Sequence, residues 1–411
     1  MRNISILILF LFFSCVGVAG EKEKVGGETV LMRLLERPLW QSDVAYNAGN
    51  YLMLPLHAAF EMKNNDLELA FGAHYKRMLN RQSDVVGQDS LSALTRLQYL
   101  YTASRYMALA QEHAVPGVRE FLLEELNGYW KLKPAWQWGR RPFEGGFSER
   151  LEWKLKALDV KYSYYRAVID EEIFLFGIAA DLAQHHRQLK LQIPPLLKDI
   201  LGVAYKVFEQ ESVFVEGDRW LLQPGVWSDH PDYAYVGNMS AELGLSKALI
   251  KDIATDVSHS HRLPLILLSL QEAELPGSAR YNYYLKLRRG LAKQFFDVVL
   301  VPPNHQIPFY RTLNFMDGRN GVYRYQYGKM GAGKGYGAHA LSGTLLLGWW
   351  AFLPDDRARG LYQNLQENFP VMLRWIIEND PYGKDSWMYQ SGYSEVLPLL
   401  PCFASKVSGR L

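Results

Sequence analysis

The chain has 411 residues, a formal net charge of +2 and a hydrophobic content of 48%. The near-neutral charge removes the general electrostatic reason for binding nucleic acid, so we predict no nucleic-acid partner. No apolar run beyond the N-terminal region reaches eighteen residues, so we predict no transmembrane span in the mature chain.

The first twenty residues have the pattern of a secretory signal peptide. A short basic start precedes an apolar run of ten residues, Ile4 to Phe13, and small residues then extend to Gly20. A second interpretation is a lipoprotein signal in which Cys15 is lipidated, although the two phenylalanines before Ser14 fit that pattern poorly. In both cases we predict that residues 21–411 form one domain, either periplasmic or secreted.

Helical periodicity dominates the first half of the mature chain. Apolar residues recur every three or four positions, which predicts helices over residues 28–37, 44–62, 65–80, 91–110, 116–127, 148–189 and 193–210. Asp43 is the expected N-cap of the second helix, and Pro55 should kink or divide that helix. A loop rich in Trp, Pro, Gly and Arg interrupts the series at residues 130–147.

The second half mixes helices with long decorated segments. Residues 213–222 predict a β-hairpin that leads into a polar and aromatic loop, Gly225 to Asn238, where Pro231 prevents a helix. Helices are then expected over 240–253, over 254–274 with a break near Pro264, and over 278–300. A strand is expected over 321–327, and helices over 339–353 and 355–378.

These elements predict a mainly α fold with short β-hairpin insertions. About ten to thirteen helices joined by short turns, with no repeat at a fixed period, can pair and wind into an α/α toroid. The alternative is an irregular solenoid. The long loops near 130–147, 223–238 and 302–338 favour the toroid, because its loops converge at one end and line a groove.

The aromatic content is a weak indication of a saccharide ligand. The chain contains 25 tyrosines, 11 tryptophans and 19 phenylalanines, and sugar rings present flat C–H faces that stack on aromatic rings. Large helical proteins also use aromatic side chains as core, so composition alone does not decide between these uses.

The loop Gly225 to Asn238 has two interpretations. In the structural one, Asp229 caps a turn, Asp232 caps a following helix, and the tyrosines pack. In the functional one, Trp227, His230, Asn238 and a tyrosine such as Tyr235 face a sugar, because amide and neutral imidazole groups bond a hydroxyl or carboxylate without adding permanent charge.

A second cluster is Ser258-His259-Ser260-His261-Arg262. On a helix His259 and Arg262 share one face, which makes them candidate substrate contacts, whereas the plain interpretation is a polar helix end before Pro264. The two histidines lack the i,i+4 spacing of a helical metal pair and no third ligand is evident, so we predict neither a metal nor another cofactor.

A third cluster lies within the strand expected over 321–327. Alternation places Tyr323, Tyr325 and Tyr327 on one face, where they either pack on helices or form the floor of a groove. The turn Gly328 to Gly335 has the spacing of a phosphate loop but lacks the Ser or Thr that would hold Mg²⁺, so a lid or tight turn is the better interpretation.

Two features after this turn favour an acidic ligand. Lys329 and Lys334 offer positive charge, and Tyr336 and His339 lie at the start of an expected helix, where the helix dipole attracts anions. Elimination at a uronic acid requires a group that neutralises the carboxylate, a base for the C5 proton and an acid for the leaving oxygen, and His, Tyr, Asn and Arg can supply all three.

The helical make-up with His, Tyr and Asn clusters in loops resembles the exported polysaccharide lyases of the α/α toroid type, including the alginate lyase-like and heparinase-like groups. The resemblance covers the layout of most of the mature chain, although the Asn-Asn-His-Ser-Tyr-Trp signature associated with alginate lyases is absent. It implies a carboxylate neutraliser and a Tyr/His acid–base pair, without assigning individual residues.

Local chemistry then supplies the candidates for cleavage of an acidic, uronate-containing polysaccharide or oligosaccharide. We expect catalytic roles for His230, Tyr235, Tyr336 and His339. We expect substrate binding by Trp227, Asp229, Asn238, His259, Arg262, Tyr323, Tyr325 and Lys334. One alternative is a glycoside hydrolase of the same fold that uses Asp229 or Asp232 as general acid; another is a periplasmic protein that only binds glycans or assists their assembly.

Overall fold

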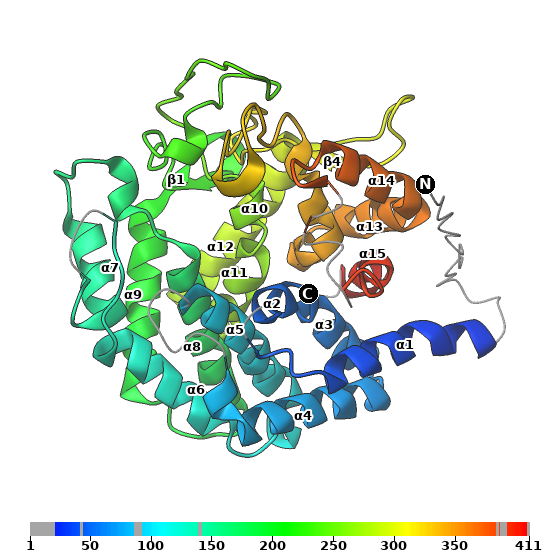
Figure 1. Ribbon diagram of the computed structural model, residues 1–411. Helices are drawn as coiled ribbons and strands as arrows, with labels where there is room; N and C mark the ends of the chain where they lie inside the picture. The colour runs from blue at the N-terminus through cyan, green and yellow to red at the C-terminus, as the bar shows by residue number, and fades with distance from the viewer. Residues whose placement is uncertain are drawn as a thin grey trace.

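The computed structural model describes residues 21–41, 44–85, 93–138, 142–383, 386 and 393–408 (Figure 1). The described chain is mainly helical, as predicted, with two short antiparallel strand pairs. Among these residues no helix combines the length and the apolar character needed to cross a membrane. The expected signal peptide, Cys15 and the expected N-cap Asp43 lie outside the described residues.

Most helices predicted for the first half are present. The prediction for residues 65–80 is confirmed in full, and Pro55 divides the helix predicted over 44–62, because Pro55 has no N–H for the carbonyl of Tyr51. The helices of this half are α1 (Glu21–Glu36), α2 (Ala45–Tyr51), α3 (Met53–Glu61), α4 (Asn65–Asn80), α5 (Ala93–Ala110), α6 (Val118–Asn127), α7 (Gly146–Lys156), α8 (Asp170–Gln188) and α9 (Pro195–Glu211). Shorter turns are η1 (Gln82–Asp84), η2 (Gln111–His113), η3 (Gly128–Leu132) and η4 (Ser163–Arg166).

The single helix expected over residues 148–189 is wrong, because α7 and α8 are separate. Helix α8 begins where the carboxylate of Glu172 accepts a hydrogen bond from the backbone N–H of Ile169 at 2.8 Å. Asp170 and Glu171 also favour a start at this point, since acidic side chains stabilise a helix N-terminus.

The hairpin predicted at residues 213–222 is confirmed as β1 (Ser212–Phe214) paired with β2 (Trp220–Leu222). Its turn contains η5 (Glu216–Asp218), and η6 (Pro231–Tyr233) lies in the loop beyond it. The later helices and strands are α10 (Val257–Ser260), α11 (Leu263–Glu272), α12 (Ala279–Gln294), β3 (Leu300–Val301), β4 (Arg311–Thr312), α13 (Arg357–Glu367), α14 (Phe369–Asn379) and α15 (Leu400–Val407). The remaining turns are η7 (Phe295–Val299), η8 (Gly328–Met330), η9 (Ala340–Leu347), η10 (Trp349–Phe352) and η13 (Leu397–Leu399).

Two elements predicted between residues 240 and 327 are wrong. The helix expected over 240–253 is an irregular loop, because Ala248 exchanges backbone hydrogen bonds with Ala234 and Gly237 instead of with its own neighbours. The strand expected over 321–327 is reduced to one bridge between Tyr323 and Tyr336, because Arg324 has a positive φ of 52° that breaks the alternation.

The two helices predicted near the C-terminus also differ. The region 339–353 consists of the 3₁₀ turns η9 and η10, and Gly348 between them has a φ of 80° that no α-helix accommodates. The helix expected over 355–378 is divided into α13 and α14 at Asn368, two residues before Pro370.

The inner helices contact one another in a closed series. Helix α3 packs on α5, α5 on α8, α8 on α11, α11 on η10, η10 on α15, and α15 on α3 again. Outside this series α4 lies against α3, α6 against α5, α9 against α8, α12 against α11 and α13 against α15 (Figure 1). Each of the five inner α-helices is therefore covered by an outer helix.

A buried charged cluster ties four of the inner helices together. The guanidinium of Arg105 in α5 lies 3.1 Å from Asp181 in α8 and 2.7 Å from Glu272 in α11, and its Nε lies 3.0 Å from His57 in α3. Arg105, Asp181 and His57 are almost completely buried. Because each charge has a partner, the interior accommodates them without an unpaired ion.

The loops 223–256 and 313–339 lie side by side over one end of the inner helices. The backbone N–H of Val322 bonds the carbonyl of Asn238, and that of Arg324 bonds the carbonyl of Asp232. Gly321 permits this approach, since a Cβ at this position would overlap the carbonyl oxygen of Val236. These two loops carry most of the predicted site residues.

Candidate functional site

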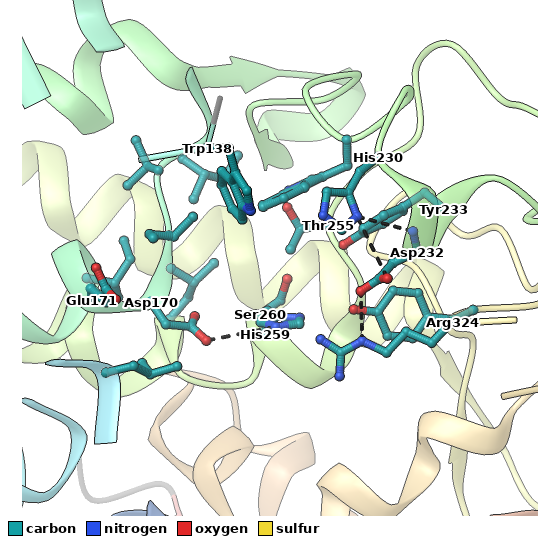
Figure 2. Close-up of a pocket in the computed structure, with 18 of the residues that line it drawn as sticks. Trp138, Asp170, Glu171, His230, Asp232, Tyr233, Thr255, His259, Ser260 and Arg324 are labelled. Carbon is teal, nitrogen blue, oxygen red and sulfur yellow. Dashed lines mark hydrogen bonds and ion pairs between the residues drawn. The ribbon is translucent and has the colours of Figure 1, made fainter. Parts of the chain in front are cut away.

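A cavity of about 430 Å³ lies between the two loops and the N-terminal end of α8 (Figure 2). Four predicted site residues line it: Trp227, His230, His259 and Tyr323. The other lining residues are Leu94, Trp136, Trp138, Val168, Ile169, Asp170, Glu171, Ile173, Leu222, Asp232, Tyr233, Thr255, Ser260, Leu263, Arg324 and Tyr327. The structure thus brings three sequence clusters together, joined by the tryptophans of the 130–147 loop.

His259 is held by a buried carboxylate. Its Nδ1 lies 2.7 Å from Oδ2 of Asp256, which is fully buried and also accepts the hydroxyl of Tyr233 at 2.7 Å. Asp256 caps α10 as well, accepting the N–H of Ser258 at 2.9 Å. Because an ionised carboxylate only accepts hydrogen bonds, Nδ1 of His259 carries the proton and the neutral ring presents an Nε2 lone pair.

The electrostatics of this pair favour a basic imidazole. Burial raises the pKa of Asp256, but His259, Ser258 and Tyr233 outweigh it and hold that pKa far below its ordinary value. Burial lowers the pKa of His259, but the negative charges of Asp256 and Asp170 outweigh it, so this pKa lies above its ordinary value. The His259 side chain is 34% exposed, so its Nε2 edge is open to a ligand.

His230 has a different protonation state. The backbone N–H of Asp232 donates to its Nδ1 at 3.2 Å, so in the neutral ring the proton lies on Nε2. Burial lowers the pKa of His230, and nearby Arg324 lowers it further against the opposing effect of Asp232. His230 is therefore a neutral hydrogen-bond donor at neutral pH.

Arg324 is the cationic group of the cavity. Its Nε donates to Oδ2 of Asp232 at 2.9 Å, and its guanidinium lies 5.1 Å from the ring centre of Tyr323 and 4.8 Å from that of Tyr327. Within the described ranges Nη1 and Nη2 have no hydrogen-bond partner, and Figure 2 shows the guanidinium extending into the cavity near His259. Two donors are thus free for an anionic ligand.

The carboxylates across the cavity are both paired. Asp170 accepts from Arg262 at 2.8 Å and lies 3.9 Å from Nε2 of His259, and Glu171 accepts from Arg150 at 2.8 Å. Arg262 is buried and also donates to the hydroxyl of Tyr46 at 2.9 Å. Arg262 thus lies behind the cavity wall, contrary to the expected contact with substrate, and holds Asp170 in place.

Aromatic rings form the upper wall beside His230. Trp138 lies edge-on to Trp136, Trp227 and Tyr164, with ring centres 4.9, 6.1 and 5.4 Å apart respectively, and 5.9 Å from the centre of His230. These rings shield His230 from solvent, which agrees with its lowered pKa.

Four predicted residues of the two loops lie outside the cavity. Tyr235 and Tyr325 pack against each other with ring centres 4.5 Å apart, and the hydroxyl of Tyr325 donates to the carbonyl of Glu242 at 2.5 Å. Asn238 bonds loop carbonyls through its amide group. Asp229 accepts the N–H and the hydroxyl of Ser163, both at 2.7 Å, which is the structural role weighed for it.

The residues expected after the glycine-rich turn also lie outside. His339 has a φ of 65° and bonds the carbonyl of Thr312 and the amide of Asn320, so no helix dipole acts on it. Burial raises the pKa of Tyr336, which pairs with Tyr323 through a backbone bridge and lies with its ring centre 6.2 Å from that of Tyr323. Lys334 lines a separate hollow with Asp380, and the side chain of Lys329 is outside the described part of the structure.

Sequence reasoning missed the partners that give the site its geometry. Asp256 was detectable, since Asp-Val-Ser-His is an N-cap pattern that places Asp256 three residues before His259. Strand alternation predicts Arg324 on the face opposite Tyr323 and Tyr325, but the strand does not form. Asp170 appeared only as part of a long helix.

Comparisons with protein-family models, with curated proteins and with solved structures find no match to this chain. Across the described ranges, no group of three or more His, Cys, Asp or Glu side chains is arranged to hold a metal ion. The site is therefore interpreted from its own geometry.

Proposed function

We propose that this protein is an exported enzyme that cleaves a uronate-containing polysaccharide by β-elimination. One observation carries the proposal: the free Nη1 and Nη2 of Arg324 share a cavity with the open Nε2 of His259. A guanidinium with two free donors matches a carboxylate, and a base beside it can remove the proton on the adjacent carbon.

The proposed reaction has two proton transfers, one from C5 to the enzyme and one from the enzyme to the leaving oxygen O4. Arg324 bonds the uronate carboxylate and stabilises the negative charge that develops when C5 loses its proton. Nε2 of His259 takes that proton, and the C5–H electron pair forms the C4=C5 double bond while the C4–O4 bond breaks. The resulting His259 imidazolium returns the proton to O4, so one residue serves as base and then as acid.

His230 and the tyrosines have supporting roles in this proposal. Neutral His230 cannot give up its Nε2 proton without becoming an anion, so it donates a hydrogen bond to a substrate oxygen. Tyr233 bonds Asp256 and burial raises its pKa, so it orients Asp256 and does not act as the acid. These roles differ from those expected for His230, Tyr235, Tyr336 and His339.

The decisive experiment is incubation with a panel of uronate polymers. β-Elimination yields unsaturated ends that absorb in the ultraviolet, and His259→Ala should reduce their formation by about 10²- to 10⁴-fold. Lack of such product across the panel would argue strongly against the proposal. Binding without product would instead favour a glycan-binding protein.

A glycoside hydrolase is the second candidate, because Asp170 and Asp232 both line the cavity. Asp229, the other carboxylate that the sequence offers as general acid, bonds Ser163 outside the cavity. Hydrolysis requires two carboxyl groups on opposite sides of the glycosidic bond. New reducing ends without unsaturation, lost in Asp170→Asn or Asp232→Asn, would select this candidate.

We also propose an α/α toroid and removal of the N-terminal segment. The closed series of inner helices and its outer layer support the first proposal. The signal-like pattern of residues 1–20 supports the second. Mass spectrometry of the protein from its native host distinguishes cleavage before Glu21 from lipidation at Cys15.

A further inference from the structure

The side of the cavity away from Arg324 combines two paired carboxylates with an aliphatic lining. Figure 2 shows Asp170 and Glu171 across the cavity from Arg324, and the neighbouring lining residues from the same segment are Val168, Ile169 and Ile173. Three leucines, Leu94, Leu222 and Leu263, add to the aliphatic lining. Asp170 and Glu171 are paired with arginines, so this side requires no charged partner.

A small apolar recess adjoins this cavity. A hollow of about 10 Å³ shares Leu222, Thr255, Ser260 and Leu263 with it and continues between Trp220, Leu291 and Met316. This volume is near the minimum that one water molecule requires, and the lining is mostly apolar. The chemistry of the recess therefore favours one small apolar group, such as a methyl group.

Two hydroxyl groups lie between the cavity and this recess. Thr255 and Ser260 line both spaces, and Figure 2 shows Ser260 beside His259 and Thr255 nearer to His230. In the part of the chain that the structure describes, neither hydroxyl group has a hydrogen-bond partner. A ligand with an oxygen acceptor next to a methyl group satisfies the hydroxyls and fills the recess.

An unsubstituted sugar fits this side poorly. On binding, its hydroxyl groups would lose their hydrogen bonds to water and contact aliphatic side chains instead, and this loss costs free energy. We propose, resting on the proposed function, that the substrate is an acetylated uronate glycan. The acetyl methyl group enters the recess, its carbonyl oxygen accepts from Ser260 or Thr255, and the uronate carboxylate binds Arg324.

The test compares a naturally O-acetylated uronate polymer with the same polymer after mild alkaline deacetylation, and a polymer with N-acetylated amino sugars with its N-deacetylated form. We expect kcat/KM to be about tenfold or more higher for one acetylated form than for its deacetylated partner, because one well-placed methyl group in an apolar pocket discriminates to this extent. Equal kcat/KM within both pairs would overturn the inference.

Two variants make the assignment specific. Ser260→Ala should move the ratio of the two kcat/KM values toward one, whereas Ser405→Ala, a matched change on α15, should leave it as in the wild type. An unchanged ratio in both Ser260→Ala and Thr255→Val would also overturn the inference.

Failure of the proposed function is distinguishable from failure of this inference. Absence of unsaturated product from every polymer would reject the proposed elimination, but it would not reject the inference about acetyl binding, which is then tested by itself. Acetylated and deacetylated oligosaccharides of the same series are then compared by calorimetry. Tighter binding of an acetylated form supports the inference, and equal affinity or no binding of either form overturns it.

Discussion

Arg105 and Arg324 show two uses of a guanidinium in one chain. Arg105 is 1% exposed and its bonds tie α5 to α3, α8 and α11. Arg324 also pairs with a carboxylate, Asp232, but its side chain is 29% exposed and its Nη atoms face a cavity. The first cluster satisfies its charges internally, whereas the second leaves donors for a ligand.

This difference predicts that Arg105 contributes mainly to stability and Arg324 mainly to function. A buried ion whose partner is removed destabilises the folded state strongly, because the remaining charge has no water to solvate it. A partly exposed ion is solvated even after its partner is lost, so its contribution to stability is small. The two arginines therefore predict opposite outcomes for equivalent substitutions.

The largest effect is expected from Arg105→Met. This change leaves Asp181 and Glu272 without their cation, and we expect a loss of about 3–5 kcal/mol in the free energy of unfolding. Denaturant titration followed by circular dichroism measures it. Arg357→Met, which removes ion pairs at a half-exposed arginine, is the control and should cost about 1 kcal/mol or less. Equal losses in the two variants would contradict the assigned roles.

Arg324→Gln tests the role of the arginine that faces the cavity. We expect the rate of unsaturated-product formation to fall by about 10²- to 10³-fold, as on removal of one donor that stabilises developing charge. The free energy of unfolding should fall by less than in Arg105→Met. Arg319→Gln, at a surface ion pair with Asp252, is the control and should retain activity. An Arg324→Gln variant that is destabilised as much as Arg105→Met but keeps the wild-type rate while folded would reverse the assignment.

Local elements were predictable because their determinants are local. The spacing of apolar residues defined Asn65–Asn80, and the Gly217 turn between two β-rich runs indicated the hairpin. The position of Arg324 was not predictable, since it depends on Asp232, which lies 92 residues earlier in the sequence. A positive φ at Arg324 then reverses the face that alternation assigns to it.

Contacts between segments distant in the sequence also explain why the helix predicted after residue 238 is wrong. Residues 240–253 have a helical pattern, but their backbone groups bond the neighbouring loop segments. Asp256 and His259 are the intermediate case, since the capping pattern is local but the buried contact with Tyr233 is not. Loops that lie over the ends of the inner helices take their conformation from one another, and short-range sequence patterns do not contain that information.

A smaller effect is expected from Asp256→Asn. Loss of the negative charge lowers the pKa of His259, whose value above the ordinary one depends on Asp256 and Asp170. Since the base acts only when deprotonated, wild-type activity should rise with pH through this pKa, and the rise should move to lower pH in the variant. We expect kcat to fall by roughly 10- to 100-fold, less than the full contribution of a general base.

The pH dependence of kcat and of kcat/KM checks this prediction. Asp317→Asn, which alters a loop carboxylate bonded to Ala254 and Arg319, is the control and should not move the acid limb. An acid limb that stays in place in Asp256→Asn would show that His259 is not the titrating base. The cavity would then require another group, and Asp170 would be the next candidate.

The smallest effect is expected from His339→Asn. Asparagine tolerates the left-handed backbone that His339 adopts, and its short side chain bonds nearby backbone groups, so the turn before η9 should persist. Because the His339 ring bonds Thr312 and Asn320 outside the cavity, activity should stay within about twofold of the wild type, far below the effect of a general base. Steady-state kinetics alongside His230→Asn measures the contrast. A loss of about 10²-fold or more in His339→Asn, with unchanged stability, would mean that the loops rearrange when substrate binds and bring His339 to the cavity.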